Sequence, residues 1–158
     1  MSSAHASQTP GPTSEAAASA SGSGPAGGRV VHEVTILLYS DDITTRDAVR
    51  AAVGRRPARD VEVVAWKECA TAPVVVSEVE QGGFDLLILD GETSPMGGLG
   101  LTRQLKNEIF DCPPILVLTG RPQDGWLAAW SQAEAAVPHP IDPIALSSAV
   151  AELARRPR

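Results

Sequence analysis

The sequence has few cysteines, fewer basic than acidic residues and no long hydrophobic run, and each shortage excludes a class of protein. Its two cysteines, Cys69 and Cys112, are far apart and have neither CxxC spacing nor a neighbouring histidine cluster. This pattern argues against a disulfide framework and against a zinc site. Lysine and arginine total 13 against 19 aspartates and glutamates, which gives a net charge of −6. That balance disfavours binding to nucleic acid or to an anionic membrane surface.

The apolar runs are short, as residues 115–118 illustrate. A helix needs ~20 apolar residues to span a bilayer, so we expect no membrane insertion. The chain also begins without the basic region and following apolar region of a signal peptide, and we therefore expect a cytoplasmic protein. With 158 residues and 43% hydrophobic content, the chain can form one domain with its own core.

Residues 1–28 differ in composition from the rest of the chain. They are almost all Ser, Ala, Gly, Pro and Thr, and Glu15 is their only formally charged side chain. Such a segment cannot bury enough apolar surface to offset the entropy lost on ordering. The sequence predicts a flexible low-complexity tail at 1–28 and a folded domain at 29–158. Two interpretations of the tail stay open: a disordered extension, or an arm that anchors the protein to a partner.

Beyond residue 29, short apolar runs alternate with segments of helical periodicity. The predicted strands are 34–40, 61–66, 84–90, 113–120 and 135–137, and the predicted helices are 43–54, 74–81, 100–109, 125–133 and 142–156. Because the strands are apolar throughout, they should form a parallel sheet that helices cover on both faces. The predicted fold class is α/β, with a doubly wound five-stranded parallel sheet.

Polar residues follow the carboxyl ends of these strands, where doubly wound sheets place their functional sites. They are Ser40, Asp41 and Asp42 after the first strand, Asp90 after the third, Thr119 after the fourth and His139 after the fifth. The carboxylates of Asp41 and Asp90, with a backbone carbonyl, would supply the oxygen ligands that Mg²⁺ prefers. A carboxylate beside such an ion can attack a phosphoryl group. Thr119 would offer its hydroxyl, and Gly120 an unobstructed N–H, to the phosphoryl oxygens.

Four features stand together in this order: the acidic pair Asp41 and Asp42, LLILDGETSPMGGLGLTRQLK at 86–106, ILVLTG at 115–120 and HPIDP at 139–143. On these features, the residues from Glu33 to about Arg155 resemble the receiver domain of two-component response regulators, which has a flavodoxin-like (βα)5 fold. The resemblance implies that Asp90 is the phosphoacceptor and Thr119 the switch hydroxyl. It also implies that Asp41, Asp90 and the backbone carbonyl of Glu92 are magnesium ligands.

Three positions depart from the family pattern. Ser40 stands where the first acid of the metal site is usual, so a neutral hydroxyl replaces a carboxylate and weakens a possible Mg²⁺ site. His139 stands in place of the usual lysine, and two interpretations of it stay open: a structural turn residue, or an acid-sensing residue whose pairing with a phosphoryl group depends on its charge. Ala136 replaces the aromatic residue that usually reorients when the domain switches. The usual readout is therefore missing.

Trp126 and Trp130 lie one turn apart on the predicted fourth helix. Such a pair lies in a core more often than at an interface, but an exposed pair would mark a surface for a partner. Since no output module follows the last predicted helix, we expect a stand-alone receiver that is not an enzyme and acts through a surface.

Two functions stay open, and a third is weak. The first is an atypical receiver-like docking module, an accessory or regulatory subunit of a larger protein assembly with the tail as its anchor. The alternative is a phosphorylation-dependent single-domain regulator that accepts a phosphoryl group on Asp90 from a histidine kinase. Ser40, Ala136 and His139 favour docking. Asp41, Asp90 and Thr119 keep phosphotransfer open. A flavodoxin-like enzyme with Asp90 as its nucleophile is weak, because nothing resembles a substrate pocket.

Overall fold

The structure is a computed structural model that describes residues 30–93 and 96–157. The predicted tail at 1–28 and the predicted domain boundary at residue 29 lie outside the described residues. From Val31 onward the chain forms one compact unit. Within the described part of the chain, no helix is both long enough and apolar enough to cross a membrane.

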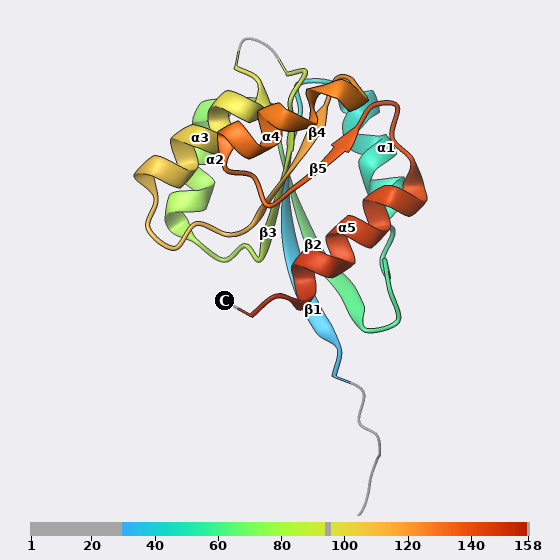
Figure 1. Ribbon diagram of the computed structural model, residues 1–158. Coiled ribbons are helices and arrows are strands. Elements are labelled where there is room, and N and C mark those ends of the chain that lie inside the picture. Colours follow the sequence, from blue (N-terminus) through green and yellow to red (C-terminus); the bar gives the residue numbers. More distant parts are fainter. Residues whose placement is uncertain (1–29, 94–95, 158) are drawn as a thin grey trace, which may run out of the picture. The chain divides into compact units, whose positions relative to one another are not determined.

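Strands and helices alternate through the described residues, and the strands form one parallel sheet of five with the order β2-β1-β3-β4-β5 (Figure 1). The strands are β1 (His32–Tyr39), β2 (Val61–Cys69), β3 (Leu86–Asp90), β4 (Ile115–Thr119) and β5 (Ala135–Pro138). The helices are α1 (Ile43–Val53), α2 (Ala72–Gln81), α3 (Gly98–Glu108), α4 (Gly125–Ser131) and α5 (Pro143–Arg155), and the short 3₁₀ helix η3 (Pro122–Asp124) precedes α4. The predicted doubly wound fold is confirmed.

Two hydrophobic cores lie on opposite faces of the sheet, as the alternation of side chains along a strand requires. Ile36 and Leu38 of β1 belong to the core covered by α1 and α5. Leu37 and Tyr39 belong to the core covered by α2, α3 and α4. Because the strands are parallel, their carboxyl ends lie at one edge of the sheet (Figure 1). The polar residues that end or follow the strands are therefore placed at this edge.

Polar caps fix where the helices beside this edge begin. The Asp42 carboxylate accepts a hydrogen bond from the amide of Thr44 at 2.8 Å and caps α1. Asp142 accepts one from the amide of Ile144 at 3.0 Å and caps α5, whose first residue is Pro143. Each cap holds the loop before its helix in a defined position.

One glycine allows α3 to begin close to the end of β3. A Cβ atom at Gly98 would lie 2.8 Å from the carbonyl oxygens of Leu89 and Asp90, a distance that real Cβ contacts do not reach. Only glycine permits this approach of helix to strand. The predicted start of α3 at residue 100 is therefore two residues late.

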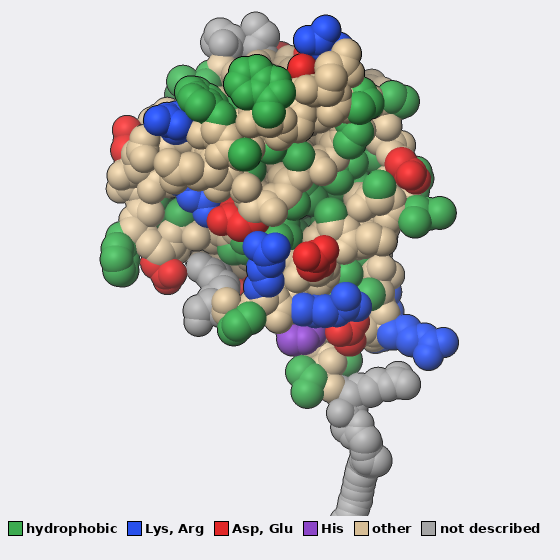
Figure 2. All heavy atoms as spheres, in the orientation of Figure 1, with side chains coloured by type: hydrophobic (Ala, Val, Ile, Leu, Met, Phe, Trp, Pro, Cys, Tyr) green, Lys and Arg blue, Asp and Glu red, His purple; other side chains and the backbone are tan. Residues whose placement is uncertain are grey.

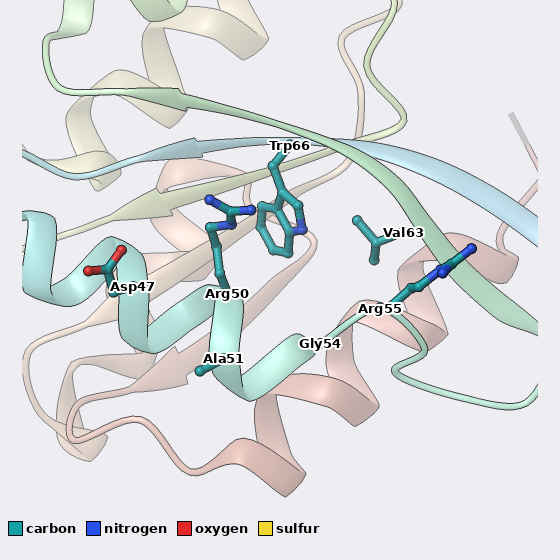
Figure 3. Close-up of a pocket in the computed structure, with 7 residues that line it drawn as sticks. All are labelled: Asp47, Arg50, Ala51, Gly54, Arg55, Val63 and Trp66. Carbon is teal, nitrogen blue, oxygen red and sulfur yellow. The ribbon is translucent and has the colours of Figure 1, made fainter.

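Strand β2 is longer than predicted and reaches Cys69 instead of ending at Trp66. The side chains of Arg50 on α1 and Trp66 on β2 lie beside each other, with the guanidinium carbon 5.8 Å from the ring centroid (Figure 3). They line a hollow of about 470 Å³ on the flank of α1. Arg50 also donates to Glu68 at 2.7 Å. Trp66 is therefore a half-buried residue within β2, and it packs against α1 through Arg50.

Candidate functional site

Asp90 ends the central strand of the sheet, and its side chain is almost fully buried, at 3% exposure for the residue. Strand β1 lies on one side of β3 and strand β4 on the other. This position brings residues that are far apart in the sequence to the Asp90 carboxylate.

Three groups contact the two carboxylate oxygens of Asp90. The Ser40 hydroxyl donates to Oδ2 at 2.8 Å, and the Glu92 amide donates to Oδ1 at 3.0 Å. The Nε2 atom of His139 lies 3.2 Å from Oδ1 and donates to it when Nε2 carries the proton. Both oxygens of this buried carboxylate therefore have protein partners, as a buried charge requires.

Ser40 is completely buried, and the surrounding groups hold it in place. Its Oγ atom accepts a hydrogen bond from the Asp42 amide at 3.1 Å. Its backbone carbonyl accepts one from Nη1 of Arg46 at 2.7 Å, and Arg46 in turn contacts Glu68. The position that lacks the usual acid is thus an integral part of the hydrogen-bonded site.

His139 and Thr119 come from neighbouring strand ends. The His139 amide donates to the Thr119 carbonyl at 2.8 Å, and the peptide bond between His139 and Pro140 is cis. The imidazole is a quarter exposed and reaches Asp90, whereas the Thr119 residue is 2% exposed. His139 therefore has a backbone role in the turn and also contacts the candidate phosphoacceptor.

A pocket of about 270 Å³ opens beside Asp90, and its lining is strongly acidic. The lining residues are Asp41, Asp42, Thr45, Asp90, Glu92 and His139. Among these described residues are four carboxylates and one imidazole, with no lysine or arginine. Thr119 is not among the described residues that line the pocket. The field in such a pocket repels a phosphoryl donor, which is itself an anion.

The side chain of Glu92 has a position that the sequence did not reveal. A methyl group added to Gly120 would collide with the Glu92 carboxylate. A carboxylate therefore fills the space on the Cα side of Gly120. That Gly120 offers its N–H to phosphoryl oxygens stays a prediction. The family resemblance implied only a backbone role for Glu92. The direction of a loop side chain depends on a rotamer that spacing does not determine.

Tyr39 connects the end of β1 with the loop that follows β3. Its hydroxyl donates to the carbonyl of Met96 at 2.7 Å. Burial raises the pKa of Tyr39, and the negative charges of Asp41 and Asp90 raise it further. The phenol is thus a neutral donor that stabilises the loop after Asp90. The sequence did not indicate this role, because Tyr39 lies within an apolar run.

The residues at this site do not fit a bound divalent cation in the arrangement observed. Mg²⁺ requires near-octahedral oxygen ligands, and both oxygens of Asp90 already accept protein hydrogen bonds. Among the described residues, no group of three His, Cys, Asp or Glu side chains is placed to hold a metal. Asp41 lines the pocket, but the Ser40 hydroxyl stands where a further carboxylate would be needed.

Both tryptophans of α4 are exposed, Trp126 to 68% and Trp130 to 50%. The two tryptophans are therefore surface residues and not part of the core. The Arg103 guanidinium carbon lies 4.6 Å from the centroid of the Trp130 ring, and Nη1 donates to the Trp130 carbonyl at 2.8 Å. Figure 2 shows hydrophobic side chains gathered over α4 on this face of the molecule.

Comparison with known proteins gives relatives that are response regulatory proteins. An uncharacterised response regulatory protein of Mycobacterium tuberculosis is 55% identical over 122 residues, which cover 77% of this chain and 92% of the relative, in both strain CDC 1551 and strain H37Rv. A comparison with descriptions of protein families gave no match.

Solved structures agree on the fold. The receiver domain of the Francisella response regulator 1452 has a TM-score of 0.65 at 13% identity and covers 78% of this chain and 98% of its own. The chemotaxis response regulator CheY4 of Vibrio cholerae has a TM-score of 0.62 at 18% identity and covers 77% and 98%. The likeness to these two shows the fold alone, whereas the mycobacterial relative is similar over nearly its whole length. On that similarity, this chain belongs to the response regulators, and its described residues have the fold of their receiver domain.

Proposed function

We propose that this receiver domain acts by docking to another protein, as an accessory or regulatory subunit of a larger assembly. The exposed pair Trp126 and Trp130 carries the proposal. In this role the domain catalyses no reaction, works in the cytoplasm and contacts neither nucleic acid nor membrane. The net charge of −6 supports a protein partner over a nucleic acid.

The α4 surface has the composition of a binding surface. Tryptophan and arginine are the residues most enriched among those that dominate binding free energy at protein interfaces. Here Arg103 contacts both the ring and the carbonyl of Trp130, so this indole is held in place before any partner arrives. A preorganised side chain loses less conformational entropy on binding, and this favours affinity.

The Asp90 pocket supports docking over phosphotransfer. A phosphoryl donor that enters the pocket approaches the carboxylates of Asp41 and Glu92 as well as that of Asp90. Ser40 and His139 already occupy the Asp90 oxygens. Phosphorylation of Asp90 would have to overcome this repulsion and break these contacts.

The tail at 1–28 is the second part of the proposal. It lies outside the described residues, so only its composition supports the idea of an anchor. With Glu15 as its one formally charged side chain, the tail could not bind by charge and would bind through backbone and small side chains.

One observation favours a second candidate function. His139 lies 3.2 Å from Asp90, on the pocket side of the carboxylate. A protonated imidazole there would attract a phosphoryl oxygen, so a histidine kinase that binds this domain could still transfer a phosphoryl group to Asp90. In that case the domain is a phosphorylation-dependent regulator.

Affinity purification of the full chain from its native cells tests the docking proposal. Quantitative mass spectrometry would compare the wild type with the double variant Trp126→Ala/Trp130→Ala and with Asp90→Asn. Phe110→Ala is the matched control. Phe110 is an aromatic residue that is 99% exposed, and it lies in the loop between α3 and β4, away from α4 in the sequence. We expect the double variant to lose a partner that the other two proteins retain. Loss of the same partner in Asp90→Asn alone would favour the phosphorylation-dependent function instead.

A second purification tests the anchor. A chain that lacks residues 1–28 should fold normally and lose the same partner. If the shortened chain retains that partner at full yield, the tail is not an anchor, while the proposal for the α4 surface still stands.

A further inference from the structure

We infer that Ser40 takes the place of a divalent cation at the Asp90 site, so that the state of this receiver domain does not depend on Mg²⁺. The Ser40 hydroxyl donates to Oδ2 of Asp90 at 2.8 Å, on a residue that is completely buried. The inference concerns the ligands of Asp90 alone and does not depend on where the domain docks.

The direction of the Ser40 hydroxyl is determined by its neighbours. A hydroxyl has one proton to donate and lone pairs with which to accept. The Asp42 amide occupies a lone pair of Ser40 Oγ at 3.1 Å, and the proton then points to Asp90. The backbone of Ser40 is fixed as well, because its carbonyl accepts from Arg46. Ser40 is therefore a positioned donor.

A cation at Asp90 would displace this donor. Oδ2 accepts from Ser40, and Oδ1 accepts from the Glu92 amide and faces His139. If a metal ion took Oδ2, the buried Ser40 hydroxyl would lose its acceptor, and an unsatisfied buried donor costs free energy. The hydroxyl would have to rotate away, and the Asp42 amide already engages one of its two lone pairs. The arrangement thus opposes metal binding.

Two other carboxylates of the pocket, those of Asp42 and Glu92, are already engaged elsewhere. Asp42 accepts from the amide of Thr44 and the hydroxyl of Thr45, so it serves as the cap of α1. The Glu92 carboxylate lies against Gly120. The pocket attracts cations in general because of its charge, but Mg²⁺ requires several oxygens at near-octahedral positions. No described group of three acidic, His or Cys side chains provides such positions.

A titration of the full chain with Mn²⁺ tests the inference. Mn²⁺ has ligand preferences similar to those of Mg²⁺ and broadens the NMR signals of nearby nuclei. Amide spectra of the wild type, Ser40→Asp and Ser40→Ala would be recorded with increasing Mn²⁺. We expect the amide signals of Asp90 and Glu92 to stay sharp in the wild type and to broaden in Ser40→Asp. The added carboxylate should tighten Mn²⁺ binding at least about tenfold, because ligand charge controls the affinity of such sites.

Each outcome decides the question. Selective broadening of the Asp90 and Glu92 signals in the wild type would overturn the inference, whatever Ser40→Asp does. The wild-type titration is decisive even if Ser40→Asp does not fold. In Ser40→Ala, which adds no bulk, the carboxyl ¹³C resonance of Asp90 should shift while Mn²⁺ binding stays absent. An unchanged Asp90 resonance in Ser40→Ala would show that the hydroxyl does not hold Asp90 and would also overturn the inference.

Discussion

The Nε2 atom of His139 lies 3.2 Å from Oδ1 of Asp90, and the His139 amide donates to Thr119 in the neighbouring strand. The imidazole is thus attached to the end of the sheet and reaches the carboxylate from its exposed side. A lysine at the same position would add a permanent positive charge to a pocket that the four carboxylates dominate.

Under the phosphorylation-dependent alternative, replacement of His139 by lysine should raise the rate of phosphoryl uptake on Asp90 near neutral pH. A charge-assisted hydrogen bond of about 1.5 kcal/mol in the transition state corresponds to a rate increase of roughly tenfold. The measurement is the phosphorylated fraction over time with acetyl phosphate. His139→Gln is the neutral control and should give no increase. Equal uptake by the wild type and His139→Lys would leave His139 with its role in the turn alone.

Removal of the exposed tryptophans should change stability very little. Trp126 is 68% exposed and Trp130 is 50% exposed. Trp126→Ala and Trp130→Ala should therefore each change the free energy of unfolding by no more than about 0.5 kcal/mol. Leu101→Ala removes a fully buried side chain of α3 and should cost about 2–5 kcal/mol. Urea denaturation measures all three. A large loss in the tryptophan variants would show that these residues belong to the core and would remove the basis for docking.

Two glycines of α3 should respond in opposite ways to the same substitution. Gly98→Ala places a methyl group against the carbonyls of Leu89 and Asp90 and should destabilise the domain by about 1–3 kcal/mol. Gly100→Ala meets no atom within 4 Å and should stabilise the domain by about 0.5–1 kcal/mol, because alanine is the better helix former. Thermal unfolding of the two variants makes the comparison. Equal effects would contradict the close approach of α3 to β3.

The ion pair between Asp60 and Arg155 predicts a pH dependence. The Arg155 guanidinium donates to both Asp60 oxygens, at 2.6 and 2.7 Å, and lowers the pKa of Asp60 from 3.8 to about 2. Since the folded-state pKa is the lower one, this stabilisation is complete above 3.8 and is lost as the pH falls toward about 2. An NMR titration of the Asp60 carboxyl should give the low pKa in the wild type and an ordinary value in Arg155→Gln. Identical titrations would contradict the pairing.

The fold was predictable from the sequence because each strand of a parallel sheet is apolar on both faces and each helix carries a recognisable start or stop. The helical periodicity of the segments between the strands marked the helices from local rules alone. The predicted start of α3 was two residues late because Gly98 belongs to the helix. A glycine is needed at this position because the β3 carbonyls lie close to it, and this tertiary contact is not visible in the local sequence.

The sequence predicted which residues belong to the candidate site better than it predicted their contacts. Strand ends brought Ser40, Asp41, Asp90 and His139 together as expected, since parallel strands end at one edge. The position of the Glu92 side chain against Gly120 depends on a rotamer, and the exposure of Trp126 depends on how far α4 stands from the sheet. Neither is encoded in spacing or periodicity.

Intact-protein mass spectrometry after incubation with acetyl phosphate tests the central claim, that this receiver domain acts through its surface and not by phosphotransfer. The wild type and Asp90→Asn would be compared with and without Mg²⁺, with folding confirmed by circular dichroism. We predict no phosphoryl adduct above background on either protein. An adduct on the wild type that is absent from Asp90→Asn would contradict the account, since Asp90 would then be a working phosphoacceptor.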